Sequence, residues 1–165
     1  MKALIKINQL THLAAELGAV LQEKCWVLAL AESCTGGMAA QAVTSVAGSS
    51  ACFERGFVTY SNQAKIDMLG VLAVTIDTFG AVSEETAQEM ATGALKNSHA
   101  HIAGSITGIA GPAGGTPEKP VGTVCFGVAQ ASQCITSTQH FTGNREQIRQ
   151  QATVFLMQQL IERVK

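Results

Sequence analysis

Apolar and polar residues follow one another along this chain in segments typical of an α/β protein. Apolar residues at helical spacing predict an amphipathic helix over 8–24, and a short apolar run predicts a buried strand over 26–31. The same patterns predict helices over 38–46, 61–69, 83–98 and 144–164, a helical turn over 75–79, and strands over 56–60, 102–107, 123–129 and 135–141. Alternating strands and helices, followed by a hairpin, predict a three-layer α/β/α sandwich around a mixed β-sheet.

Length and composition narrow the class of protein. We expect residues 1–165 to form a single domain with a substantial core. The net charge of −1 and the 5% aromatic content argue against a nucleic-acid partner. Since no apolar run approaches the roughly 18 residues of a membrane span and no signal peptide is evident, we expect a cytoplasmic protein without a membrane partner. The five cysteines form no Cys-x-x-Cys pair and indicate neither a disulfide framework nor a zinc site.

The first expected strand ends in the polar and glycine-rich segment Glu32-Ser33-Cys34-Thr35-Gly36-Gly37. A strand that leads through a tight turn into a helix leaves backbone N–H groups unpaired, and the helix dipole there favours negative charge. This makes Ser33 a candidate nucleophile. The plainer interpretation is a serine or threonine that caps the next helix.

A base for that serine has to be found among few residues. The chain has only two aspartates, no histidine stands in a suggestive context, and neither metal-ligand spacing nor a nucleotide-binding glycine motif is present. If strand 56–60 lies beside strand 26–31, Lys65 and Tyr60 come close to Ser33. A lysine in a dry cleft loses its charge readily and can accept a proton, although most lysines on helices are simply solvated.

The segment 108–122 is too irregular for a helix or strand. It holds all three prolines and five of the sixteen glycines. Because a long loop inside a compact domain is usually functional, we expect it to form a wall of the binding site rather than a mere surface excursion.

Several motifs, in the same order along nearly the whole chain, resemble the C-terminal domain of CinA proteins. They lie at 31–37, 48–50, 53–62, 80–83, 107–112, 117–124 and 141–145. Stand-alone members of this family are nicotinamide-nucleotide amidases, which hydrolyse nicotinamide mononucleotide (NMN) to nicotinate mononucleotide and ammonia in pyridine-nucleotide salvage. The resemblance implies a Ser/Lys dyad without metal or cofactor. Activities of the N-terminal domain found in longer CinA proteins are not implied.

Carried to this sequence, the resemblance makes Ser33 the nucleophile and Lys65 its base, with Tyr60 and Thr107 assisting by hydrogen bonding. We expect backbone N–H groups around Thr35 and Gly36 to hold the oxyanion. The residues expected to hold the substrate are Glu32, Thr35, Gly36, Ser50, Arg55, Gly108, Gly111, Pro112 and Arg145. Arg145 is the first choice for the phosphate, although an ordinary surface ion pair explains either arginine equally well.

Other interpretations stay open at this point. Ser50, Ser61 and Cys34 are rival nucleophiles, with Ser61 also explained as a helix cap. The protein could hydrolyse the amide of another small nucleotide-like compound, or bind a nucleotide or a protein partner without turnover. A homodimer is expected from the general frequency of symmetric oligomers.

Overall fold

The computed structural model describes residues 2–165, with side chains from residue 9 onward. The helices are α1 (Lys2–Glu23), α2 (Met38–Thr44), α3 (Asn62–Leu69), α4 (Ala73–Phe79), α5 (Glu84–Lys96) and α6 (Arg145–Val164), with a short 3-10 helix, η1, at Ser49–Ala51. The strands are β1 (Leu28–Glu32), β2 (Phe53–Val58), β3 (Ile102–Gly108), β4 (Thr123–Gln130) and β5 (Gln133–His140).

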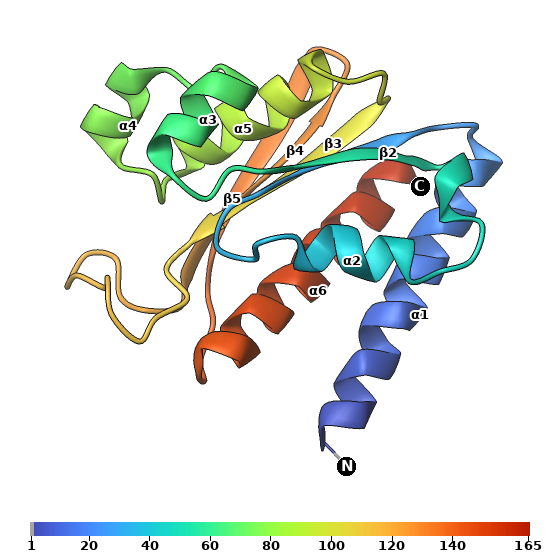
Figure 1. Ribbon diagram of the computed structural model, residues 1–165, viewed down its shortest axis with the longest axis horizontal. Coiled ribbons are helices and arrows are strands. Elements are labelled where there is room, and N and C mark those ends of the chain that lie inside the picture. The colour runs from blue at the N-terminus through green and yellow to red at the C-terminus, as the bar shows by residue number, and fades with distance from the viewer. Residues whose placement is uncertain (1) are drawn as a thin grey trace.

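The strands form one mixed sheet in the order β2-β1-β3-β4-β5. Strands β2, β1 and β3 are parallel, whereas β4 pairs antiparallel with both β3 and β5. Helices α1, α2 and α6 cover one face of the sheet, and α3, α4 and α5 cover the other (Figure 1). The predicted α/β/α sandwich with a mixed sheet is therefore confirmed.

The side chains of β1 point alternately to the two faces of the sheet. Leu28 and Leu30 pack in the larger core beneath α1, α2 and α6, while Ala29 and Ala31 pack in the smaller core beneath α3 and α5. Because successive strand side chains point to opposite faces, Glu32 continues the first series. Ser33, one residue beyond the strand, continues the second and lies on the α3/α5 side.

Most predicted elements exist, with shifted bounds. Helix α1 begins six residues before the predicted start, and α2 ends two residues earlier than predicted. Strand β2 is displaced at both ends, since it spans 53–58 instead of the predicted 56–60. As an edge strand with half of its residues exposed, β2 carries charged side chains at Glu54 and Arg55, so its first half lacks the apolar pattern of a strand. No helix within residues 2–165 is long and apolar enough to cross a membrane.

Candidate active site

Ser33 and Lys65 meet at the carboxyl ends of β1 and β2. The Lys65 Nζ lies 3.0 Å from Ser33 Oγ and 3.0 Å from the carbonyl oxygen of Thr59, to which it donates. Lys65 is only 1% exposed and is one of the largest fully buried side chains. Adjacent parallel strands bring the two residues together, because β1 delivers Ser33 and the segment after β2 leads directly into α3. The juxtaposition predicted from the sequence is present.

The surroundings of Lys65 favour its neutral form. Burial lowers the pKa of the Lys65 amine, and the nearby Cys34 thiol opposes this effect. Within the described part of the chain, Lys65 forms no ion pair with a carboxylate. A lysine without a counter-ion in a dry site can act as a base.

Cys34 lies beside Ser33 but is poorly suited to replace it. Burial raises the pKa of the Cys34 thiol to about 12, although Arg149 and Lys65 act in the opposite direction. Since the thiolate is the reactive form of cysteine, a thiol that stays protonated at neutral pH is a weak nucleophile. This favours the Ser33 hydroxyl.

Glu32 and Thr35 do not face the substrate side of the turn. The Glu32 carboxylate, 1% exposed, accepts hydrogen bonds from Thr35 Oγ1 at 2.6 Å and from three backbone N–H groups at the start of α2. These donors are Gly37 and Ala39 at 3.1 Å and Ala40 at 2.8 Å. The carboxylate therefore caps α2, and the expectation that these two side chains hold the substrate is corrected.

The expected oxyanion donor Gly36 is also engaged. Its N–H donates to the carbonyl of Ser33 at 3.1 Å. By contrast, the Thr35 N–H has no hydrogen-bond acceptor within residues 2–165, and the Cys34 N–H reaches only the thiol of its own residue. The free backbone donors of the turn are thus those directly after Ser33.

An open cleft of about 260 Å³ lies over Ser33. Tyr60, Arg145 and the start of the long loop, including Gly108 and Gly111, line it. The Arg145 guanidinium donates to the Gly111 carbonyl at 2.8 Å and to the Tyr60 hydroxyl at 2.7 Å. The loop therefore forms one wall of the cleft, whereas the exposed Pro112 is not part of its lining.

Three other predicted residues lie away from the cleft or are already bonded. Ser50 belongs to η1, which precedes β2. It therefore lies at the amino ends of the parallel strands, whereas Ser33 lies at their carboxyl ends. Arg55, in the middle of β2, donates to the carbonyl of Asn97 and pairs with Glu54. Thr107 is 1% exposed and donates to the carbonyl of Ala81 at 2.7 Å. Substrate contacts by Ser50 and Arg55, and assistance to catalysis by the Thr107 hydroxyl, are not supported.

Ser61 lies at the first turn of the helix that carries Lys65. Its Oγ accepts a hydrogen bond from the N–H of Ala64 at 3.0 Å, as the helix-cap interpretation predicts. The hydroxyl of this rival serine is therefore engaged in capping α3.

Two residues at the site were not singled out from the sequence. Arg149, in α6, donates to the carbonyl of Thr35 at 2.7 Å and so ties α6 to the turn after Ser33. Its spacing of four from Arg145 puts both arginines on one helix face, which is a signal that the sequence does carry. Thr59 lies within a recognised motif, but only its burial beside Lys65 makes it notable.

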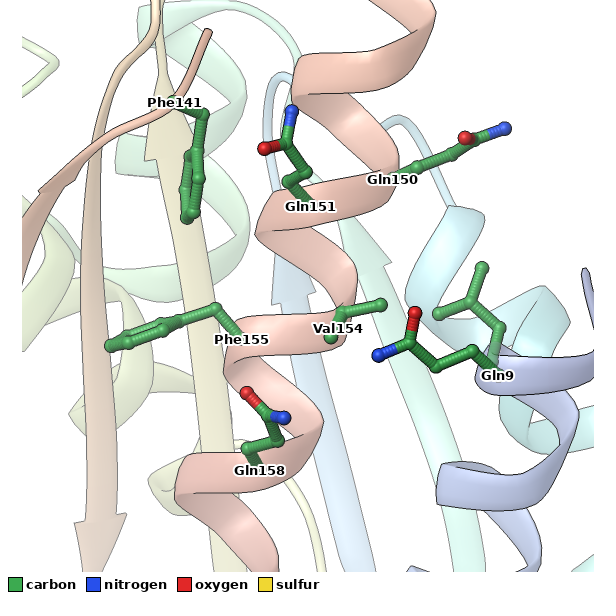
Figure 2. A pocket seen from close by; sticks show the side chains of 8 residues that line it. Gln9, Phe141, Gln150, Gln151, Val154, Phe155 and Gln158 are labelled. Carbon is green, nitrogen blue, oxygen red and sulfur yellow. The ribbon is translucent and has the colours of Figure 1, made fainter. Parts of the chain in front are cut away.

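A second groove lies between α1 and α6, where Leu10, Phe141, Val154 and Phe155 meet amide side chains such as Gln9 and Gln158 (Figure 2). It has a volume of about 230 Å³, and the lining residues within 9–165 include no acid, base or hydroxyl. Among the described residues, no three His, Cys, Asp or Glu side chains gather in a group that could hold a metal ion.

Comparison with known proteins gives sequence relatives over most of the chain. A nicotinamide-nucleotide amidohydrolase PncC from Enterobacter agglomerans is 53% identical over 92% of this chain and 93% of its own. The protein of the same name from Escherichia coli K12 is 51% identical over 93% of each chain. A CinA-like protein from Chlorobaculum tepidum is 60% identical over 67% of this chain but only 26% of its own length.

Solved structures show the same fold. The competence/damage inducible protein CihA from Agrobacterium tumefaciens superposes with a TM-score of 0.91 at 43% identity, covering 93% of this chain and 94% of its own. A CinA superfamily protein from Klebsiella pneumoniae superposes with a TM-score of 0.91 at 40% identity, covering 94% and 97%. The family model of the CinA C-terminal domain matches residues 10–164. From its sequence, its fold and these relatives, the chain belongs to the CinA C-terminal domain family.

Proposed function

We propose that this protein is an NMN amidohydrolase, which converts nicotinamide mononucleotide to nicotinate mononucleotide and ammonia. Relatives more than 50% identical over more than nine-tenths of both chains carry the name nicotinamide-nucleotide amidohydrolase. The observation that carries the proposal is the buried Lys65 amine 3.0 Å from the Ser33 hydroxyl at the floor of an open cleft. A role in pyridine-nucleotide salvage, a cytoplasmic location and a homodimer stay predictions.

In the proposed acylation step, neutral Lys65 accepts the proton of Ser33 as Oγ attacks the carboxamide carbon. The Lys65 ammonium then protonates the departing nitrogen, the carbon–nitrogen bond breaks, and ammonia leaves. The nicotinoyl group remains as an ester on Ser33. In the second step Lys65 takes a proton from water, the resulting hydroxide attacks the ester, and the proton returns to Ser33 Oγ.

Backbone donors next to Ser33 would stabilise both tetrahedral intermediates. Within the described chain the Thr35 N–H has no acceptor and the Cys34 N–H reaches only its own thiol, which supports them as the oxyanion donors in place of Gly36. The hydrogen bond from Arg149 to the Thr35 carbonyl at 2.7 Å would hold this turn in position.

Arg145 is the proposed phosphate ligand. It is the first residue of α6, where the helix dipole favours an anion, and it is exposed at the wall of the cleft. Its two observed hydrogen bonds, to Gly111 and Tyr60, use two of the five guanidinium N–H groups. The remaining N–H groups are available for a phosphate, and the Tyr60 hydroxyl beside Arg145 would contact it too.

The test is ammonia release from NMN by the purified protein in the presence of a chelator, beside Ser33→Ala and Lys65→Met. We expect turnover by the parent and a loss of about 1,000-fold or more in each variant, with folding checked by circular dichroism. The matched control is Ser50→Ala, at the amino ends of the parallel strands and away from Ser33. It should keep the activity.

Each contrary outcome points to a different alternative. Full activity of Ser33→Ala would refute the nucleophile and return attention to the other serines. NMN that binds without releasing ammonia would favour a nucleotide-sensing module. Turnover of a different nucleotide-like amide, but not of NMN, would keep the dyad and change the substrate.

A further inference from the structure

The hydroxyl of Thr59 is a buried polar group that the structure leaves unpaired. Thr59 follows β2 directly, is fully buried, and its Oγ1 has no hydrogen-bond partner within residues 2–165. The backbone of the same residue is fully engaged, since its N–H donates to the Glu32 carbonyl at 2.8 Å and its carbonyl accepts from Lys65 Nζ at 3.0 Å. An unpaired buried hydroxyl costs about 1–3 kcal/mol and calls for an explanation.

The side chain of Thr59 lies on the same face of the sheet as Lys65. A Cβ added at Gly37 would lie 3.7 Å from Val58 Cγ2, so Val58 faces α2. Thr59 is the next residue and still pairs with β1 through its N–H, so its side chain points to the opposite face, beneath α3. The orphan hydroxyl is therefore on the side from which Lys65 enters the site.

Protonation changes what Lys65 needs from its neighbours. A neutral amine has two N–H groups and one lone pair. In the proposed neutral form the lone pair would face the Ser33 hydroxyl, whose Oγ lies 3.0 Å away, and the Thr59 carbonyl accepts one N–H. The ammonium form has three N–H groups, of which one stays on the Thr59 carbonyl and one points toward Ser33 Oγ or the leaving nitrogen. The third N–H has no acceptor in the resting arrangement.

We propose that the Thr59 hydroxyl accepts this third N–H, so that Thr59 positions and stabilises the Lys65 ammonium each time the lysine takes up a proton. The inference rests on the proposed Ser/Lys function of the site and adds a third residue to it. In the arrangement observed the hydroxyl is unpaired and does not yet bond Lys65 Nζ, so rotation of the Thr59 side chain has to bring Oγ1 to the ammonium. Once in place, this acceptor would stabilise the transition states of both half-reactions, because Lys65 carries the proton in each.

Among the side chains of residues 9–165, no charged group competes with Thr59 for the ammonium. The Cys34 thiol, on the turn after β1, is the one titratable group that acts on Lys65. On β3, Ser105 and Thr107 donate to carbonyls of Ala87 and Ala81. The carboxylates of the helices on this face are bonded elsewhere or exposed: Asp67 to Gln63, Glu84 to Thr136 and Thr138, Glu89 to Leu72 and Thr75, with Asp77 and Glu85 at the surface.

The experiment compares Thr59→Val, which removes the hydroxyl and keeps the shape, with Thr59→Ser, which keeps the hydroxyl. NMN turnover is measured between pH 5 and 10, together with thermal unfolding. For Thr59→Val we expect kcat to fall about 10- to 100-fold with KM unchanged, the range for one hydrogen bond to a charged group. We expect an unchanged or higher Tm, since an unpaired buried hydroxyl is removed. Thr59→Ser should recover most of the parent's kcat.

The pH profile separates this role from a purely structural one. Activity requires neutral Lys65, so it rises with pH through the pKa of that amine. Removing an acceptor of the ammonium lowers this pKa further, so the acidic side of the profile of Thr59→Val should move to lower pH by about one unit. A Thr59→Val enzyme with the parent's kcat, or with reduced kcat but an unmoved profile, would overturn the inference.

Parallel measurements on Ser33→Ala and Lys65→Met show which proposal has failed. If both dyad variants lose turnover while Thr59→Val behaves as the parent, only the role of Thr59 is refuted. If the dyad variants keep their turnover, the proposed mechanism fails and the role of Thr59 fails with it.

Discussion

At the scale of single residues, the fold treats its two buried charged groups in opposite ways. The Glu32 carboxylate receives four hydrogen bonds, three of them from the N-terminus of α2, which compensate its burial. The Lys65 amine contacts one hydroxyl and one carbonyl and forms no ion pair within the described chain. The first arrangement stabilises the charged form of Glu32. The second disfavours the charged form of Lys65, so burial lowers the pKa of its amine.

Replacing Glu32 therefore tests a structural role against a substrate-binding one. In Glu32→Ala, four buried or partly buried donors lose their acceptor, and we expect the free energy of unfolding to fall by at least about 2 kcal/mol in urea titrations. We also expect kcat to fall while KM for NMN changes little, because the turn that holds Ser33 loosens. Glu85→Ala, at the exposed first turn of α5, should cost less than about 1 kcal/mol. A raised KM at unchanged stability would mean that Glu32 contacts the substrate after all.

At the scale of elements, the position of α3 decides whether Lys65 reaches Ser33. Helix α3 packs against α5 so closely that a Cβ added at Gly93 would overlap the backbone carbonyl of Leu69, the last residue of α3. Backbone cannot be moved aside as a flexible side chain can. Gly93 therefore sets the distance between the two helices and, through α3, the place of the Lys65 amine.

A single methyl group at Gly93 should impair catalysis from a distance. In Gly93→Ala, α3 has to shift away from α5, and a displacement of about 1 Å at a reacting group can cost about 100-fold in rate. We expect a fall in kcat of this order in the ammonia-release assay. The matched control is Gly18→Ala in α1, where a Cβ meets only Cys52 Sγ at 3.8 Å. It should keep the parent's kcat and gain up to about 1 kcal/mol in stability. Parental kcat in Gly93→Ala would show that α3 is not held at this contact.

At the scale of the whole molecule, the cleft is assembled from segments that are far apart in the chain. The carboxyl ends of the parallel strands supply its floor, and the loop between β3 and β4 supplies a wall. The loop is tied to α6 by Arg145 and to the segment between α4 and α5 by Lys119. The Lys119 amine donates to the carbonyls of Phe79 and Val82 at 2.7 Å each.

Removing the hydrogen bonds of Lys119 should loosen this wall of the cleft and leave Ser33 and Lys65 in place. For Lys119→Met we expect KM for NMN to rise about tenfold and kcat to change less, because two hydrogen bonds from a charged group are lost. Limited proteolysis within the loop should become faster. Lys96→Met, at the exposed end of α5, is the control and should alter neither quantity. If KM and the cleavage rate of Lys119→Met match the parent, the loop is held by other contacts.

The sequence was sufficient to predict the layered fold, because periodicity defines the elements. It predicted the meeting of Ser33 with Lys65 only on the condition that the two strands are neighbours, so that their carboxyl ends come together, and through the family resemblance. It was insufficient for Arg55, because β2 begins at Phe53 instead of the predicted residue 56, which places Arg55 within the strand. Ser50 precedes the strand with either start and lies at its amino end, away from Ser33.

By itself, then, the sequence determined the elements, their order in layers, the glycine turn after β1 and the family. The tertiary structure alone decided which polar groups form hydrogen bonds within the protein and which stay available. It bonds Arg145 to Tyr60 across 85 residues and Arg149 to Thr35 across 114, and it uses the Glu32 carboxylate to cap α2. Within the described residues it leaves the Thr59 hydroxyl without a partner. The physical reason is that hydrogen bonding and desolvation depend on proximity in space, which the periodicity of a chain does not encode.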